Sequence, residues 1–221
     1  MKQMKKLLSA ALALALILSS LLAFSACSKN PTVYLAIEDY GIVTIELYEG
    51  DAPITVANFI SLVEKGFYDG LTFHRIIESF MIQGGDPMGD GTGGADQDIT
   101  GEFKMNGYDT GIKHVEGTIS MARSGSPYES YLYAGYDVPM EYLSPAFNSA
   151  SSQFFIVTET SANNTASLDG KYAAFGRVTE GMEIIKQIAA VKTDADDKPL
   201  SPVTIATITF DLEKAEAALK K

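Results

Sequence analysis

The sequence predicts a mainly β protein, an antiparallel barrel of many short strands with two α-helices closing its ends. Three observations support this fold class. Short runs of β-branched and aromatic residues recur along the chain and are bounded by turn residues. Only two segments within the predicted domain carry the apolar periodicity of a helix. Strands and helices do not alternate as they do in parallel sheets. The 221 residues are enough for one domain of ordinary size.

The first predicted elements are two strands and a helix. Residues 33–37 and 42–47 are strand-like runs separated by a turn. Pro53 begins a helix at a position where its missing N–H would have no helical partner, and Gly66 ends this helix. Apolar residues recur within it at helical spacing and predict a face that packs on the sheet: Val56, Phe59, Ile60 and Val63.

The stretch 73–87 combines a cation, an amide and large apolar side chains. His74-Arg75-Ile76 and Met81-Ile82-Gln83 both alternate as strands do. On two neighbouring strands, Arg75 and Gln83 would stand on one face beside Phe80 and Met81. Such a face offers a hydrogen-bond donor above an apolar floor, without a nucleophile or metal ligands. From these residues alone, a hairpin with an incidental surface arginine is the alternative.

The remaining elements follow in the second half of the chain. Residues 117–123 predict a strand, residues 181–190 predict the second helix, and residues 203–210 predict a closing strand. Residues 212–221 form a short charged tail, for which we expect at most a frayed helix.

Two weak motifs lie in and beside the glycine-rich loop 87–101. A G-x-G-x-x-G pattern starts at Gly89, but no amphipathic helix follows it, which disfavours a dinucleotide site. Asp96 and Asp98 resemble the start of a calcium loop, but Gly107 stands where the bidentate glutamate belongs. Only a weak surface cation site therefore stays open.

Histidine and cysteine are too few for a transition-metal centre. His74 and His114 are the only histidines, and Cys27 is the only cysteine. We expect each histidine to be a hydrogen-bonded structural residue. The sequence thus predicts no cofactor, no metal and no disulfide framework.

The first 31 residues have the pattern of a bacterial lipoprotein. A basic start precedes an apolar run that ends in small residues before Cys27. This predicts a signal peptide over 1–26, lipidation of Cys27 with a tether over 27–31, and an extracytoplasmic protein anchored by lipid to a bacterial cell membrane. Simple secretion with a free thiol is the alternative. The net charge of −11 argues against nucleic acid as a partner.

Three motifs in order resemble the cyclophilin-type peptidyl-prolyl isomerases. The stretch F-H-R-I-I-E-S-F-M-I-Q-G-G-D over 73–86 matches that family's signature, and the blocks S-Q-F-F-I over 152–156 and L-D-G-K over 168–171 with F-G-R-V over 175–178 follow in the same order. The resemblance runs from about Val33 to Phe210. It implies an isomerase domain over 32–211, an eight-stranded antiparallel barrel closed by two helices, and an active groove on the outer wall.

The resemblance also implies roles for individual residues. Arg75 would donate to the proline nitrogen, Gln83 would bond the substrate backbone, and Phe80 would complete the catalytic set. The other groove residues would bind substrate around the proline: Met81, Ala122, Arg123, Gln153, Phe155, Leu168 and Tyr172. Gln153 would support Arg75 or the peptide.

Two stretches depart from the family pattern. Residues 124–146 form an insertion with five tyrosines and three prolines, which is either a lid or recognition surface or a decorative loop. Ser167 stands where many relatives have tryptophan or histidine. Because the relatives with tryptophan resemble tight cyclosporin binders, we expect weak cyclosporin binding here.

The sequence therefore predicts a monomeric peptidyl-prolyl isomerase that acts without covalent catalysis on proline-containing peptides and unfolded exported proteins. The alternative is a proline-peptide binding or holdase module with little turnover, in which the insertion dominates. The intact Arg75 favours the enzyme, because a module that only binds peptide does not need it. A solute-binding lipoprotein is disfavoured by the small single domain.

Overall fold

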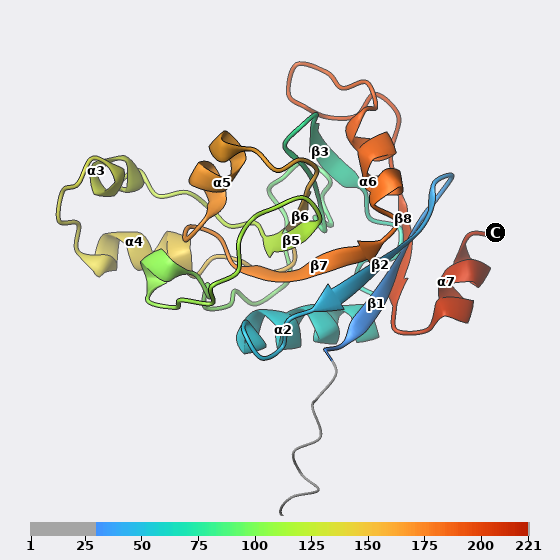
Figure 1. Ribbon diagram of the computed structural model, residues 1–221, viewed down its shortest axis with the longest axis horizontal. Helices are drawn as coiled ribbons and strands as arrows, with labels where there is room; N and C mark the ends of the chain where they lie inside the picture. Colours follow the sequence, from blue (N-terminus) through green and yellow to red (C-terminus); the bar gives the residue numbers. More distant parts are fainter. Residues whose placement is uncertain (1–29, 221) are drawn as a thin grey trace, which may run out of the picture.

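The computed structural model describes residues 30–220, which form one eight-stranded antiparallel sheet in the order β3-β4-β6-β5-β7-β2-β1-β8 (Figure 1). The strands are short, as the sequence predicts. Their bounds are β1 Thr32–Ile37, β2 Gly41–Leu47, β3 Phe73–Ile77, β4 Met81–Gly84, β5 Thr118–Met121, β6 Phe154–Val157, β7 Ala174–Glu180 and β8 Ile205–Thr209.

The sheet curls until its two edge strands nearly meet. Thr72 and Thr204 form an isolated bridge between the segments that lead into β3 and β8. Beside it, the Phe73 N–H donates to the Val203 carbonyl at 2.9 Å, and the Ile205 N–H donates to the Leu71 carbonyl at 2.8 Å. These bonds nearly close the barrel and leave few edge groups unpaired. The predicted eight-stranded barrel is confirmed.

The barrel interior is filled by one face of each strand and by aromatic rings. In β2, Val43, Ile45 and Leu47 are fully buried while the residues between them are half-buried. Phe59 from a helix lies 5.1 Å from Phe175 and 5.8 Å from Phe154, measured between ring centroids. Such aromatic pairs contribute about 0.5–1.5 kcal/mol each beyond the area that they bury. The core therefore joins strands that are distant in sequence.

Two helices cover the barrel as the sequence predicts. Helix α2, Pro53–Glu64, packs Phe59 into the core, and its first turn is capped from outside because the Glu102 carboxylate accepts from the Thr55 N–H at 2.7 Å. Helix α6, Met182–Ala189, buries Ile185 and Ile188 and lies on the other side of the barrel from α2 (Figure 1).

The described chain also holds four further short α-helices, of which the sequence patterns indicate only the C-terminal one, and that one as at most a frayed helix. They are α3 Glu129–Tyr133, α4 Met140–Phe147, α5 Ala162–Leu168 and α7 Leu212–Ala218. A single-turn 3₁₀ helix, η1, spans Lys104–Asn106. Helices α3, α5 and α7 have five to seven residues and bury only one or two side chains each, too few for a clear period. Helix α4 is as long as α6, but Pro145 lies inside it and gives its sequence a helix breaker.

The expectation of a frayed C-terminal tail is wrong. Asp211 caps α7 by accepting from the Glu213 N–H at 3.0 Å and the Lys214 N–H at 3.3 Å. Ala215 is fully buried, and the helix packs on β1 and β8. Ala215 is the one buried residue of α7, and a single alanine gives almost no hydrophobic period in the sequence. The helix is therefore explained by its packing on β1 and β8.

Candidate active site

The candidate site is a second apolar cluster on the outer wall of the barrel. Strand residues alternate in direction, so Phe154 points into the barrel core and Phe155 points outward. In β4, Ile82 points inward and Met81 outward for the same reason. The outward residues Met81, Phe155 and Val157 pack with Leu168 of α5, and partly buried residues surround them: Ile77, Phe80, Ala122 and Tyr172.

A hollow of about 220 Å³ opens over this cluster. All but one of the predicted groove residues line it: Arg75, Phe80, Met81, Gln83, Ala122, Arg123, Phe155, Leu168 and Tyr172. The exception, Gln153, lines a second hollow of about 390 Å³ that shares Gln83, Ala122 and Arg123 with the first. The fold thus brings together on one face residues that the sequence distributes over nearly a hundred positions.

Arg75 and Gln83 share a face, as their alternation predicts, and the register of β3 and β4 pairs them directly opposite each other. The Arg75 side chain is 44% exposed, so its guanidinium reaches the rim of the hollow instead of its floor. The Gln83 amide donates to Gln153 Oε1 at 2.9 Å. Gln153 in turn donates to the carbonyls of Gly91 and Gly93, at 3.0 and 2.7 Å. Gln153 therefore orients Gln83 and the glycine loop, and it makes no hydrogen bond to Arg75.

The residue that contacts the Arg75 guanidinium was not predicted. Asp197 Oδ2 lies 3.4 Å from Arg75 Nε. Asp197 belongs to a charged loop before β8, far from Arg75 in the sequence. No motif in that loop indicates the contact, because it depends on the near-closure of the barrel.

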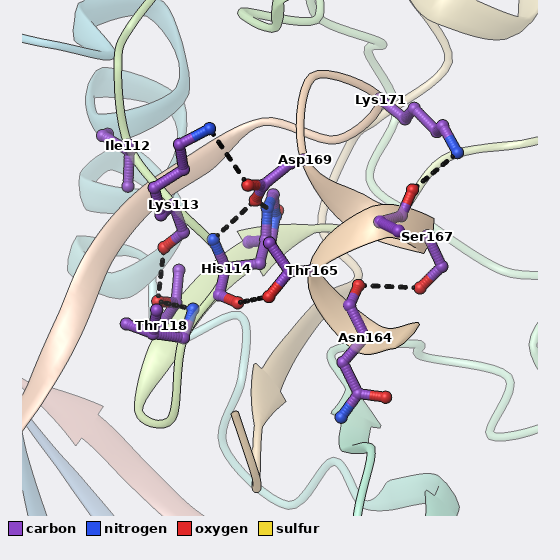
Figure 2. A network of polar contacts seen from close by, with 12 residues as sticks. Ile112, Lys113, His114, Thr118, Asn164, Thr165, Ser167, Asp169 and Lys171 are labelled. Carbon is purple, nitrogen blue, oxygen red and sulfur yellow. Dashed lines mark hydrogen bonds and ion pairs between the residues drawn. The ribbon is translucent and has the colours of Figure 1, made fainter. Parts of the chain in front are cut away.

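A polar network joins the segment that leads into β5 to the end of α5 (Figure 2). The His114 ring stacks on Phe155 with centroids 6.1 Å apart, and its Nδ1 lies 3.0 Å from Asp169 Oδ1. Its Nε2 lies 3.0 Å from Ser120 Oγ. Lys113 Nζ is 3.2 Å from Asp169 Oδ2. Since Asp169 directly follows Leu168, this network positions one wall of the hollow.

The two histidines differ in their surroundings. Burial lowers the pKa of His114, against the opposing effect of Asp169. His114 is hydrogen-bonded, which confirms the prediction for this residue. The prediction is wrong for His74, because both of its ring nitrogens are buried and neither has a hydrogen-bond partner within residues 30–220. Burial also lowers the pKa of His74, which favours the neutral ring.

The insertion 124–146 is tied to the groove at its start. Arg123 is only 2% exposed, and its two Nη atoms donate to both Glu129 oxygens at 2.8 and 3.0 Å. Its Nε donates to the Lys171 carbonyl at 2.9 Å, and Tyr133 donates to Glu129. Burial alone would raise the pKa of Glu129, but the bonds from Arg123 and Tyr133 outweigh it and lower that pKa to about 2.

This pairing makes α3 part of the groove surroundings. Arg123 lies between the two hollows, and its guanidinium carbon is 4.9 Å from the centroids of both Phe147 and Tyr172. Figure 1 shows α3 and α4 extending away from the barrel on the side of α5. The five tyrosines of the insertion are exposed: Tyr128, Tyr131, Tyr133, Tyr136 and Tyr142.

The remaining predicted features are the N-terminal segment, a cation site and the glycine-rich loop. Cys27, the signal peptide and most of the tether lie outside the described residues. Within residues 30–220, no group of three or more His, Cys, Asp or Glu side chains is placed to hold a metal ion. In the glycine-rich loop, the Asp86 carboxylate accepts from the N–H groups of Met88, Asp90 and Gly91. The glycine-rich loop therefore folds around the Asp86 carboxylate.

Curated proteins and solved structures resemble this chain over most of its length. Peptidyl-prolyl cis-trans isomerase-like 1 of Rhizopus delemar is 42% identical over 159 residues, which cover 72% of this chain and 80% of that protein. The protein of the same name in Neurospora crassa is 40% identical over 75% of this chain and 85% of its own length. A Cryptosporidium parvum cyclophilin-type isomerase superposes with a TM-score of 0.64 at 28% identity, covering 81% of this chain and 96% of that structure.

These relatives contradict the expected location. Curated isomerases that match this chain come from fungi and from Arabidopsis thaliana, and they are not bacterial lipoproteins. The prediction of a lipid-anchored protein on a bacterial cell membrane is therefore wrong. It relied on the pattern of residues 1–27 alone. The expectation of exported client proteins is not tested by these relatives and stays a prediction. Across residues 30–220, none of the helices has the length and apolar character needed to cross a membrane.

The family assignment is supported by both sequence and structure. The family model for cyclophilin-type peptidyl-prolyl cis-trans isomerases matches residues 32–210, which include all eight strands and the whole hollow. The three motifs fall on β3–β4, on β6 and on the segment from α5 to β7. The chain belongs to the cyclophilin-type peptidyl-prolyl cis-trans isomerase family.

Proposed function

We propose that this site accelerates rotation about X–Pro bonds by stabilising the twisted amide without a covalent intermediate. Amide resonance places a barrier of roughly 18–20 kcal/mol on this rotation. Twisting the bond breaks the resonance and restores a lone pair on the proline nitrogen. A catalyst needs only to bind this twisted form better than either planar form. The observation that carries the proposal is a guanidinium at the rim of an apolar hollow of about 220 Å³.

The hollow has a suitable floor for a proline ring. Met81, Phe155 and Leu168 are each no more than 5% exposed and form an apolar surface. Phe80 and Tyr172 are partly buried at its edges. A related cyclophilin from C. parvum was crystallised in the presence of the dipeptide Ala-Pro, which supports extending this ligand class to the present chain.

The polar groups around the hollow would orient the peptide. Gln83 is already held by Gln153, so its amide keeps one orientation for the substrate backbone. Ala122 and the main chain of Arg123 would line the edge of the groove. All of these groups come from one chain, so the proposed activity requires only a monomer.

Arg75 would supply the discrimination between planar and twisted amides. Its guanidinium stays charged and is planar, so its N–H groups donate in defined directions. The lone pair on the proline nitrogen accepts such a bond only in the twisted state. If the bond is charge-assisted, its loss lowers the rate by about 10²–10³-fold.

NMR exchange spectroscopy on a short Ala-Pro peptide tests this proposal. The full chain should accelerate cis-trans exchange, and the Arg75→Ala variant should lose about 10²–10³-fold in kcat/KM. Arg177→Ala is the matched control, because Arg177 is an exposed arginine on β7 outside the hollow. Unchanged kcat/KM in Arg75→Ala would refute the role of Arg75. Peptide binding without faster exchange by the unmodified chain would instead support a binding module.

A further inference from the structure

We infer that Asp197 is a positioning residue that aims the Arg75 guanidinium at the substrate, an inference that rests on the proposed function. Asp197 Oδ2 lies 3.4 Å from Arg75 Nε. Within residues 30–220, no other acidic side chain forms an ion pair with Arg75. A contact at Nε holds the inner edge of the guanidinium. Both Nη groups then stay available to donate to a twisted amide.

The backbone places Asp197 against β3 beside Arg75. The Ile76 N–H donates to the Asp197 carbonyl at 2.8 Å. This bond attaches the charged loop to the strand at the residue that directly follows Arg75. The position of the carboxylate is therefore coupled to the strand that carries the arginine.

The hydrogen bonds of the loop hold Asp197 in a defined turn. Asp194 Oδ1 accepts from the Asp196 N–H at 2.9 Å and from the Lys198 N–H at 3.0 Å. The turn between them puts Asp197 at φ +62°, in the left-handed region. Glycine adopts this conformation with the least strain, and asparagine and aspartate tolerate it. Aspartate therefore fits the turn, and at this position its carboxylate also lies beside Arg75.

The exposure of the pair indicates that its effect is on activity more than on stability. The side chains of Arg75 and Asp197 are 44% and 41% exposed. Ion pairs at such exposed sites contribute little to folding stability. An arginine side chain has many rotamers, however, and the Asp197 carboxylate 3.4 Å from Nε favours those that keep the guanidinium beside it. This restriction matters when the guanidinium must meet a lone pair that exists only in the transition state.

Asp197→Asn is the informative variant, because asparagine has the same size and accepts the left-handed conformation. We expect kcat for the Ala-Pro peptide to fall about two- to fivefold, with KM and Tm unchanged. Asp196→Asn is the matched control, since it removes the same charge one residue away from the contact. It should leave kcat, KM and Tm as they are.

A double-mutant cycle separates positioning from a structural role. In the Arg75→Ala background, with the enzyme concentration raised to keep exchange measurable, Asp197→Asn should have no further effect on kcat. An equal loss in both backgrounds, a lower Tm, or no loss in the unmodified background would overturn the inference. If Arg75→Ala itself retained full activity, the proposed function would fail first. If Arg75→Ala lost activity and Asp197→Asn did not, only the role of Asp197 would fail.

Discussion

Replacing Glu129 by glutamine should destabilise the protein through the buried Arg123. The Arg123 side chain is 2% exposed and Glu129 is 11% exposed, so neither charge is well solvated. Both Glu129 oxygens accept from the guanidinium, and Oε1 also accepts from the Ser126 N–H at 2.9 Å. Glutamine removes the negative charge and one of the two acceptors. Arg123 then stays buried without a counter-charge.

The size of the effect follows from this geometry. Removing one partner of a buried ion pair costs about 3–5 kcal/mol in unfolding free energy. Glutamine keeps one carbonyl oxygen, and the rings of Phe147 and Tyr172 still face the cation at 4.9 Å. We therefore expect the lower end of that range, about 3 kcal/mol. For a domain of this length, such a loss lowers Tm by roughly 6–12 °C.

Thermal unfolding followed by circular dichroism measures the change in Tm. Glu141→Gln provides the control, because Glu141 is an exposed glutamate in the same insertion. The control should change Tm by less than about 1 °C. A loss in Glu129→Gln no larger than that of the control would refute the conclusion that this pair holds the insertion against the groove.

Two further predictions concern pH and ligand choice. Burial lowers the pKa of His74 and His114 in the folded protein. The unfolded chain therefore binds more protons than the folded protein below about pH 6.5. The free energy of unfolding should then fall as the pH drops from 7.5 to 5.5. Urea unfolding at both pH values measures this fall, and an unchanged midpoint would contradict it. Ser167 is exposed on α5 and precedes Leu168 of the hollow, so Ser167→Trp should tighten cyclosporin binding over that of the unmodified chain. Calorimetric titration of both proteins checks this, and equal affinities would count against it.

Local patterns account for most of the site. Alternation in β4 and β6 separates Met81 and Phe155 from their inward neighbours, because side chains on a strand have a period of two. The same alternation, with the register of β3 and β4, puts Arg75 opposite Gln83. These features needed only residues close in sequence and the family motifs that contain them. Helices α3 and α5 escaped prediction because each buries only one or two side chains, and α4 escaped it because Pro145 lies inside the helix.

The sequence by itself determined the barrel, its two covering helices and the residues that line the outer hollow. The pattern at its start predicted a location that the relatives contradict, since an apolar run before a cysteine is a short motif with little specificity. Only the tertiary structure decided that Asp197 meets Arg75, that Gln153 holds Gln83, and that Glu129 neutralises a buried arginine. Periodicity reports which face a residue occupies. It cannot report which distant loop reaches that face, because that depends on how the strands close into a barrel.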